Sequence, residues 1–343
     1  MDVREAVSAV VGGHSLTRAQ AEAVMGLIMD GEATPAQLGA LLTALHLRGE
    51  TVEEVAGFAA GLRRAAVAVQ APAGAIDVVG TGGDRSHTFN ISTVSGIVAA
   101  AAGATVAKHG NRAASSACGS ADVLEALGVK IDLGPTGVAA CIAEVGIGFM
   151  FAPRFHPALR HAGPVRREIG IRTVFNILGP LANPAGVARL VLGVPTPAIG
   201  GTIARVLVEL GVERALVVHG ADGLDEISPT GPTRTWDVSE GEVREGVIDP
   251  AALGVPRATL GEIRGGDPAR NAAMAREILG GASGAMRTAV LLNAGAACMV
   301  AGLAADLPSG MALAGRAIDS GAATLVLDRF VRASQRLGAQ EVT

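Results

Sequence analysis

Apolar side chains in residues 1–68 recur at helical spacing. Within residues 15–30 the apolar positions lie three or four residues apart, which predicts an amphipathic helix. Thr34 stands before a proline, as an N-cap residue stands before an N1 proline, and Thr51 together with Glu54 fits a capping box. We therefore predict a small all-helical domain over this stretch.

Beyond residue 74 the pattern changes to short β-branched runs that alternate with Ala-rich helical stretches. This alternation predicts βαβ units, and hence a larger α/β domain over residues 75–343 with a mostly parallel central sheet. The segment Gln70–Gly74 is expected to be a hinge. Chemistry in such a domain belongs in loops at the carboxyl ends of the strands. The predicted strands are Ile76–Val79, Thr105–Ala107, Ile147–Phe151 and Ala215–Val218.

Composition narrows the class of protein. Of the 343 residues, 49% are hydrophobic and 17% are charged, which excludes a disordered chain and suffices for one large or two smaller domains. A net charge of −4 gives no general field for a polyanion such as nucleic acid. The uncharged run Thr288–Ala305 is rich in Ala and Gly and contains Asn293, which favours a buried core helix over a membrane span.

The cysteines and the N-terminus bear on the compartment. Cys118, Cys141 and Cys298 are far apart in sequence and form no C-x-x-C pair, so neither a zinc site nor a disulfide framework is indicated. The N-terminus lacks a basic segment followed by an apolar one, so no secretory signal is predicted. A reduced cytoplasmic protein with no membrane partner is expected.

The first polar cluster, Gly80–Asp84, directly follows a predicted strand. Its glycines let backbone N–H groups approach an anion, and a helix capped by Ser92 or Thr93 would point its N-terminus at the same place. Together they suit a phosphate. A dinucleotide G-x-G-x-x-G motif fails because Arg85 holds its last position, and no lysine follows a glycine as in a Walker A motif. A simple strand-to-helix turn is the alternative.

The second cluster, Lys108–Ser116 followed by Gly119–Asp122, also lies between a predicted strand and a predicted helix. It combines Lys, Arg, Asn, Ser and His, which supply cationic and neutral donors for a phosphate and a hydroxylated sugar. A solvated surface loop would also be polar, although it would rarely place two cations among such small residues.

The third cluster, Asp222–Glu226, follows the strand Ala215–Val218 and places two carboxylates side by side in sequence. Mg²⁺ is usually held by one or two carboxylates together with substrate phosphates. Alone, the cluster would be an acidic surface turn. Because all three clusters follow strands, they can converge on one magnesium-bound diphosphate.

A fourth region, Phe149–Pro157 with Arg166–Glu168, mixes apolar surface with His and Arg. It overlaps the arginine-rich segment Arg154–Arg172, which interrupts the alternation of strands and helices and is expected to form a helix and loops. It could hold an aromatic acid, with an arginine paired to the carboxylate. Interdomain packing with solvated arginines is the alternative.

At this point the sequence resembles the anthranilate phosphoribosyltransferase family. The matching segments cover essentially the whole chain, and the block from Lys108 to Pro180 is the most specific. The resemblance implies a helical domain hinged to the α/β domain, joined in space by part of residues 154–185, and a homodimer formed through the helical part. It implies transfer of the 5-phosphoribosyl group from 5-phosphoribosyl 1-diphosphate to the amine of anthranilate, with release of pyrophosphate, in tryptophan biosynthesis.

The resemblance also implies roles for single residues. The anthranilate-binding residues would be Gly80, Asn111 and Arg166, with His109, Pro153 and His156 flanking. The metal ligands would be Ser92, Asp225 and Glu226, holding Mg²⁺, with two ions per subunit, and no residue is implied as an obligatory acid or base. The donor-binding residues would be Gly80, Gly83, Asp84, Thr88, Asn90, Ile91, Ser92, Thr93, Lys108, His109, Gly110, Asn111, Arg112, Ala113, Ala114, Ser115, Ser116 and Ser120.

Two other functions remain open from the residues. A pyrimidine-nucleoside phosphorylase-like enzyme would share a related architecture and handle ribose, phosphate and a ring; the acidic pair Asp225-Glu226 and the block at Arg166 favour a diphosphate donor instead. A homologue that binds nucleic acid without transferase activity should carry a basic face, which the net charge of −4 disfavours.

Overall fold

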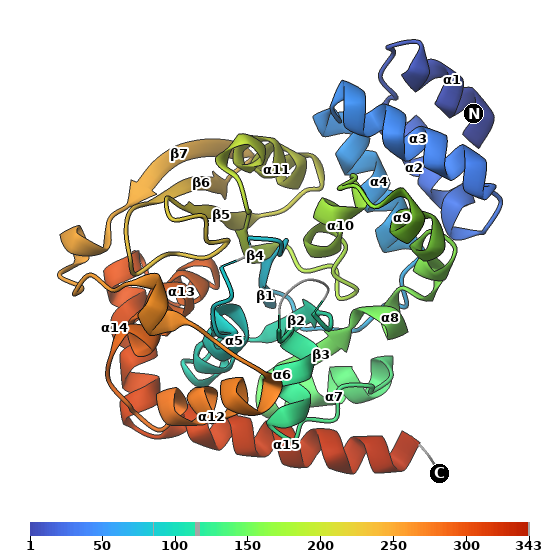
Figure 1. Ribbon diagram of the computed structural model, residues 1–343. Helices are drawn as coiled ribbons and strands as arrows, with labels where there is room; N and C mark the ends of the chain where they lie inside the picture. The colour runs from blue at the N-terminus through green and yellow to red at the C-terminus, as the bar shows by residue number, and fades with distance from the viewer. Residues whose placement is uncertain (85, 114–116, 342–343) are drawn as a thin grey trace.

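A computed structural model describes residues 1–84, 86–113 and 117–341 of the chain. Its first four helices form a bundle at one corner of the molecule, and the rest of the chain builds a sheet flanked by helices (Figure 1). The bundle helices are α1 (Val3–Val11), α2 (Arg18–Met29), α3 (Pro35–Arg48) and α4 (Val52–Arg64).

Local signals set the ends of the bundle helices. The side chains of Thr17, Thr34 and Thr51 each accept a hydrogen bond from the third backbone N–H of the helix that follows, and each forms a capping box. Helix α2 packs closely on α4 because Gly57 leaves room for it: a Cβ there would lie 2.3 Å from the carbonyl oxygen of Arg18. The fold class predicted for the N-terminal part is confirmed.

Glu54 ties three of these helices together. Its buried carboxylate accepts backbone N–H groups of Leu16 and Thr51, each at 2.9 Å, and the guanidinium of Arg48. Glu54→Ala should lower the free energy of unfolding by about 3 kcal/mol, because it leaves a buried N–H and a cation without their acceptor. Urea unfolding measures this. The exposed Glu53 on the same helix is the control, and a loss under about 1 kcal/mol for Glu54→Ala would contradict the assignment.

The described residues contain one seven-stranded sheet in the order β3-β2-β1-β4-β5-β6-β7. The first five strands are parallel, and β6 and β7 are antiparallel. Strands β1 and β4 are neighbours although the chain visits β2 and β3 between them, and ligands in open parallel sheets bind where the connections diverge in this way. The strands are β1 (Ile76–Gly80), β2 (Val106–Gly110), β3 (Ile147–Phe151), β4 (Arg189–Gly193), β5 (Arg214–Gly220), β6 (Thr233–Ser239) and β7 (Glu242–Ile248).

The mostly parallel sheet predicted from the sequence is confirmed, with differences in detail. Strand β2 continues to Gly110, so Lys108 and His109 belong to the strand rather than to the loop after it. Strand β4 and the hairpin β6–β7 were not predicted. The hairpin turns at Glu240 and Gly241, whose positive φ angles of 55° and 77° suit a two-residue hairpin loop.

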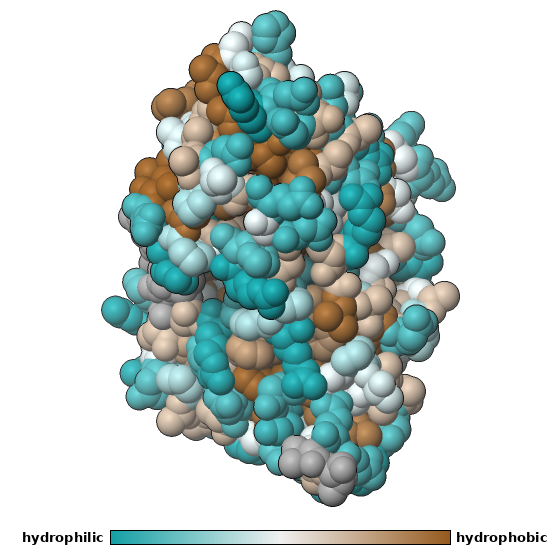
Figure 2. All heavy atoms as spheres, turned by 90° about the vertical axis from the view of Figure 1, so that its right-hand side faces the viewer, coloured by the Kyte–Doolittle hydropathy of each residue, from teal (hydrophilic) through white to brown (hydrophobic). Residues whose placement is uncertain are grey.

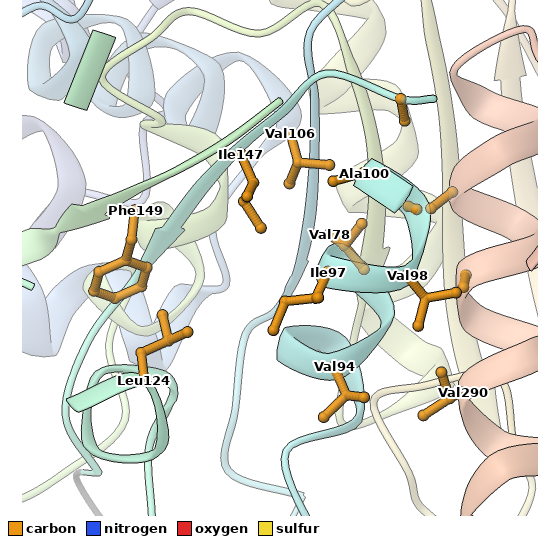
Figure 3. Packing of buried hydrophobic residues seen from close by; sticks show 14 of the residues in the cluster. Val78, Val94, Ile97, Val98, Ala100, Val106, Leu124, Ile147, Phe149 and Val290 are labelled. Carbon is orange, nitrogen blue, oxygen red and sulfur yellow. The ribbon is translucent and has the colours of Figure 1, made fainter. Parts of the chain in front are cut away.

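The strands alternate between two apolar cores. On one face Val78 and Val106 meet α5, and Figure 3 shows Ile97 and Val98 of this helix between the sheet and Val290 of α13. Because side chains point to opposite faces along a strand, this face takes every second residue. The elements that contribute to it include α5 (Ile91–Ala101), α6 (Ser120–Ala126), α7 (Pro135–Val145), α12 (Pro268–Leu279), α13 (Ala285–Val300), α14 (Leu307–Asp319) and α15 (Ala322–Glu341), with η2 (Pro250–Leu253) and η3 (Leu260–Ile263) nearby in sequence.

The other face of β4–β6 packs on α11 and shares its core with the helical bundle. Leu190 and Leu192 point to this side, and the indole of Trp236 packs against Gly200. Residues 152–181 also return to the bundle: α9 contacts α3, and α10 contacts α4. The elements are α8 (Ala152–Phe155), η1 (Pro157–Arg160), α9 (Gly163–Ile169), α10 (Phe175–Leu181) and α11 (Pro197–Glu209).

The uncharged run near the C-terminus is a core helix, as predicted. It forms most of α13, in which Asn293 is completely buried. Across the described ranges, no helix combines the length and apolar character that crossing a bilayer requires.

Candidate active site

The glycine loop after β1 is joined to the acidic turn after β5. The backbone N–H of Gly82 donates to Oδ2 of Asp225 over 2.8 Å. Gly82 and Gly83 have φ angles of 69° and 83°, a region that other residues adopt only with strain. The two loops, 143 residues apart in sequence, therefore meet at the carboxyl ends of neighbouring parallel strands, as predicted.

Glu226 holds the N-terminus of α5. Its Oε1 accepts the backbone N–H of Ser92 over 3.1 Å. The prediction that Ser92 or Thr93 caps this helix is wrong: the helix begins at Ile91, and Asn90 occupies the N-cap position without a side-chain cap bond. A carboxylate from another loop takes the place of the cap, because the N–H groups and dipole at a helix N-terminus attract negative charge.

Two glycines at strand ends make room for Asp225. A Cβ on Gly80, the last residue of β1, would lie 2.3 Å from Oδ2 of Asp225. A Cβ on Gly193, the last residue of β4, would lie 1.5 Å from its backbone carbonyl oxygen. Gly193 was not among the predicted site residues, because strand β4, which ends at this glycine, was not predicted.

Buried polar side chains fix the turn that carries the acidic pair. Asp222 accepts the hydroxyls of Ser228 and Thr230. Asn293 of α13 accepts the N–H of Ile227 and donates to its carbonyl oxygen, each over 2.9 Å. The residue after Glu226 is thus clamped on both sides of its peptide. An isolated asparagine in an otherwise apolar run was the only sequence signal for this support.

The acidic pair is poised for a cation. Burial raises the pKa of Asp225 to about 7, and the nearby charge of Asp84 adds to the effect. Burial likewise raises the pKa of Glu226 well above its usual value, followed by repulsion from Asp225. Two ionised carboxylates that are buried close together repel each other, and a positive charge between them relieves this repulsion. This donor set fits a divalent cation held by oxygen ligands.

The two cations of the second cluster are already engaged. Lys108 is buried and donates to the carbonyl oxygen of Val78 and, at 3.4 Å, to Oγ of Ser92. Arg112 instead forms ion pairs with Asp122 at 2.9 Å and with Glu125 at 2.8 Å. Lys108 therefore contacts Ser92, at the N-terminus of α5, whereas Arg112 is paired with acidic residues of α6. Both cationic groups therefore have partners within the protein.

The rest of this loop is held by its own backbone contacts. Oγ of Ser120 donates to the carbonyl oxygen of Asn111 over 3.2 Å, and Asp122 accepts the N–H of Ala113 over 2.9 Å. Gly110 must lack a side chain, because a Cβ there would lie 2.2 Å from Oγ of Ser120. The predicted loop residues Ala114, Ser115 and Ser116 lie outside the described residues.

His109 projects to the opposite face of the sheet from Lys108. Its Nδ1 lies 3.2 Å from the carbonyl oxygen of Gly179, and its ring centre lies 5.1 Å from that of His156. Burial lowers the pKa of His109 to about 3 and that of His156 to about 4. Within the described chain, Nε2 of His109 and both ring nitrogens of His156 lack hydrogen-bond partners, although the Ala182 carbonyl is close enough to oppose the shift at His156.

Arg166 lies on α9, after both histidines in the sequence. Its guanidinium stacks 5.1 Å from the ring centre of Phe175, and burial lowers its pKa. Pro153 is exposed at the start of α8. Thr88 pairs with Arg264 in an isolated β-bridge, outside the turn formed by the glycine loop.

The histidine pair predicts a pH effect on stability. Both rings stay neutral in the folded protein, whereas a histidine in the unfolded chain has a pKa near 6.5. Below that pH the unfolded chain therefore binds protons that the folded protein does not, which favours unfolding. Between pH 7.5 and 5.0 each ring should cost about 2 kcal/mol of stability. His109→Gln and His156→Gln should each remove its share of the pH dependence in urea unfolding. His14→Gln, at an exposed position, should keep the wild-type dependence; equal slopes in all variants would contradict the assignment.

Family models match both parts of the chain. Residues 4–66 match the helical bundle domain of a glycosyl transferase family, and residues 72–324 match the α/β domain of that family. Fold and site thus define a glycosyl transferase with a helical bundle beside an α/β domain.

Similar proteins narrow the class further. Anthranilate phosphoribosyltransferases of Chloroflexus aurantiacus and Thermomicrobium roseum are 55% and 56% identical, over 98% and 97% of this chain and 99% and 97% of theirs. The crystal structure of the Thermus thermophilus enzyme has a TM-score of 0.92 and 46% identity, over 96% of this chain and 99% of that one. A Saccharomyces cerevisiae structure in complex with PRPP and Mg has a TM-score of 0.89 and 26% identity, over 97% and 98%.

The chain belongs to the anthranilate phosphoribosyltransferase family. The resemblance noted in the sequence is thereby confirmed, and with it the pentosyltransferase activity of the family in tryptophan biosynthesis. These relatives support transfer from a diphosphate donor over the phosphorylase-like and nucleic-acid-binding alternatives.

Proposed function

We propose that the loops at the carboxyl ends of β1, β2 and β5 bind 5-phosphoribosyl 1-diphosphate, and that the α8–α10 side binds anthranilate. The chain then transfers the phosphoribosyl group to the amine and releases pyrophosphate. The observation that carries this proposal is the pair of contacts from Gly82 to Asp225 and from Ser92 to Glu226, because they join two anion-binding backbone turns to two cation-binding carboxylates at one point.

Magnesium fits this set of residues. Ser92, Asp225 and Glu226 offer oxygen atoms. Lys108 offsets only part of the repulsion between the two buried carboxylates, so a bound cation would stabilise them. When bound with the donor, Mg²⁺ would neutralise charge on the departing diphosphate. We propose two ions per subunit. The two carboxylates supply only part of the coordination of a Mg²⁺ ion, and oxygen atoms of the substrate would supply the rest. The yeast relative bound to PRPP and Mg supports the choice of magnesium as the metal.

The donor would be held chiefly by backbone groups. Gly80, Gly83 and Asp84 with the N-terminus of α5 would line the diphosphate, and the loop after β2 the phosphoribosyl group. In this proposal Lys108 contributes positive charge through the metal ligands, because its ammonium group already contacts Ser92 and interacts electrostatically with Glu226. Thr88 remains a predicted donor contact at the edge of the site. The other proposed donor-binding residues are Asn90, Ile91, Ser92, Thr93, His109, Gly110, Asn111, Arg112, Ala113, Ala114, Ser115, Ser116 and Ser120.

Anthranilate would lie between Arg166 and the histidine pair. The guanidinium of Arg166 has a stacking partner but no ion pair among the described residues, so it can accept a carboxylate. Asn111 and Gly80 would complete the contacts, and His109 and His156 would flank the ring. The two neutral imidazoles suit an aromatic neighbour better than a charged one, because their burial already disfavours charge.

The transfer requires no strong base. The aromatic amine has a free lone pair near neutral pH, and pyrophosphate leaves from an oxocarbenium-like carbon. Positioning the amine and stabilising charge on the leaving group supply the rate. Closure about Gln70–Gly74 would exclude the water that could otherwise hydrolyse the donor. His109→Ala or His156→Ala should therefore reduce turnover without abolishing it.

We further propose that the protein is a homodimer formed through α1 and α3. These helices contact each other, and Val11 and Leu47 on them are 69% and 80% exposed. Figure 2 shows apolar atoms gathered on the upper part of one face, at the height of the bundle. Leu47→Glu should shift the molecule toward monomers in sedimentation measurements, whereas the same change at the exposed Leu325 on α15 should leave its mass unchanged.

Two expectations from the sequence stand beside these proposals. We take residues 1–68 as the helical domain, extended in space by part of 154–185, and residues 75–343 as the α/β domain. We also expect a cytoplasmic protein, since Cys141 and Cys298 are buried without a disulfide.

The proposed function is tested by following the loss of anthranilate fluorescence with both substrates and Mg²⁺ present. Transfer should require all three, and chelation of Mg²⁺ should stop it reversibly. Thymidine with phosphate should give no phosphorolysis. Turnover that survives chelation would contradict the metal assignment, and phosphorolysis without transfer would contradict the proposed reaction.

A further inference from the structure

We propose that Arg172, in the connection between α9 and α10, is a further substrate-binding residue that pairs with the diphosphate of the donor. This inference rests on the proposed function. It assigns a cationic contact that the glycine loop and the α5 N-terminus do not themselves provide.

The guanidinium of Arg172 lies directly over the glycine loop. A Cβ built on Gly83 would lie 2.4 Å from Nη1 of Arg172, so the guanidinium occupies the space that a side chain at this position would need. Residues 83 and 172 belong to different sides of the site: the first follows β1, and the second lies between helices that contact the bundle. The arginine therefore reaches the donor loop from the acceptor side.

The backbone on both sides of Arg172 is fixed. Gly170 ends α9 in the left-handed conformation, with a φ of 67°. On the other side the N–H of Thr173 donates to Oδ1 of Asn176 over 2.9 Å, and Val174 and Phe175 enter the core shared with the bundle. The side chain itself is exposed, so a well-fixed backbone holds a guanidinium that solvent and ligands can reach.

Arg172 is available to bind an anion. Among the described residues it has no hydrogen bond or ion pair, whereas Lys108 is buried on Ser92 and Arg112 is paired with Asp122. A guanidinium binds two phosphate oxygens at once, and such charge-assisted contacts are the strong ones. Because its position is over the donor loop, the diphosphate is the anion it would meet. Arg166, stacked on Phe175, remains for the carboxylate of the acceptor.

The assignment gives one short segment two tasks. Residues 163–176 would present Arg166 to the acceptor and Arg172 to the donor, so the segment would order both substrates relative to each other. The side chain of Arg167 offers a matched control, because it is exposed and its guanidinium lies back over Gly163 of its own helix.

The test measures pyrophosphate binding and steady-state kinetics on Arg172→Gln, Arg172→Lys and Arg167→Gln. Calorimetry with magnesium pyrophosphate should show affinity reduced roughly tenfold to a hundredfold by Arg172→Gln. KM for the phosphoribosyl donor should rise by a similar factor, with KM for anthranilate and the melting temperature unchanged. Arg172→Lys should recover part of the affinity, and its remaining binding should weaken more steeply with salt.

Arg167→Gln should match wild type in every measurement. The proposal is overturned if Arg172→Gln binds pyrophosphate as wild type does, or if the KM for anthranilate rises instead. The calorimetric result is independent of turnover. A wild-type protein that binds magnesium pyrophosphate through Arg172 but does not consume anthranilate would refute the proposed reaction and support this contact.

Discussion

Glu226→Gln is expected to lower kcat/KM for transfer by about 10²- to 10³-fold, the equivalent of several kcal/mol of lost charge stabilisation. The amide oxygen can still accept the N–H of Ser92, so the helix N-terminus keeps its partner. Without added metal the variant should be at least as stable as wild type, because burial of Glu226 and its repulsion from Asp225 outweigh its attraction to Lys108. Loss of activity with retained stability is the signature of a group that serves the ligand rather than the fold.

Melting temperatures with and without Mg²⁺ and pyrophosphate separate these effects. The wild-type protein should be stabilised by the pair of ligands and Glu226→Gln much less so. Glu242→Gln, at an exposed position on β7, should match wild type in both assays. A Glu226→Gln variant with normal turnover, or one that unfolds far below wild type without metal, would contradict the role given to this carboxylate.

Gly193→Ala is expected to be severe although it adds a single methyl group. That methyl would lie 1.5 Å from the carbonyl oxygen of Asp225, so the backbone of β4 or of the acidic turn must move. Neither the methyl group nor a backbone carbonyl can relieve this clash by changing rotamer. We therefore expect a loss of about 3 kcal/mol in the free energy of unfolding. Any folded fraction should have displaced Asp225, with transfer reduced at least about tenfold.

Gly315→Ala provides the matched control. In α14 an added methyl would meet only Cδ2 of Leu291, at 3.9 Å. Replacing a helical glycine with alanine should therefore leave stability unchanged or raise it by about 0.5–1 kcal/mol. If urea unfolding gave Gly193→Ala and Gly315→Ala the same stability, the close approach at Gly193 would not exist in solution.

The glycine loop and the acidic turn could be predicted from the sequence because each closely follows a short β-branched run that favours a strand. Parallel strands bring such turns to one edge of the sheet, so Gly80–Asp84 and Asp222–Glu226 were expected to meet, and they do. The N-cap at Thr34 and the capping box at Thr51 are likewise local and were predicted correctly. These features depend on residues a few positions apart.

Features set by distant contacts escaped prediction. The N-terminus of α5 is held by Glu226, which lies 134 residues from Ser92, so nothing near the helix reveals it. Lys108 and Arg112 share one polar motif, yet a longer strand buries the first and an ion pair diverts the second. Arg172 could not be distinguished from its neighbouring arginines in the sequence, because the role proposed for it depends on its position over Gly83 in the folded protein.

The return of α10 to the bundle bears on how the chain is made. Nε of Arg63, at the end of α4, donates to the carbonyl oxygen of Leu181, 118 residues further along the chain. During synthesis the first four helices would leave the ribosome well before this covering helix exists. A nascent chain arrested near residue 70 should consequently keep an apolar surface open to chaperones. Fragments 1–70 and 71–343 should assemble when they are produced in the same cell, but not when each is produced alone and the two are mixed afterwards.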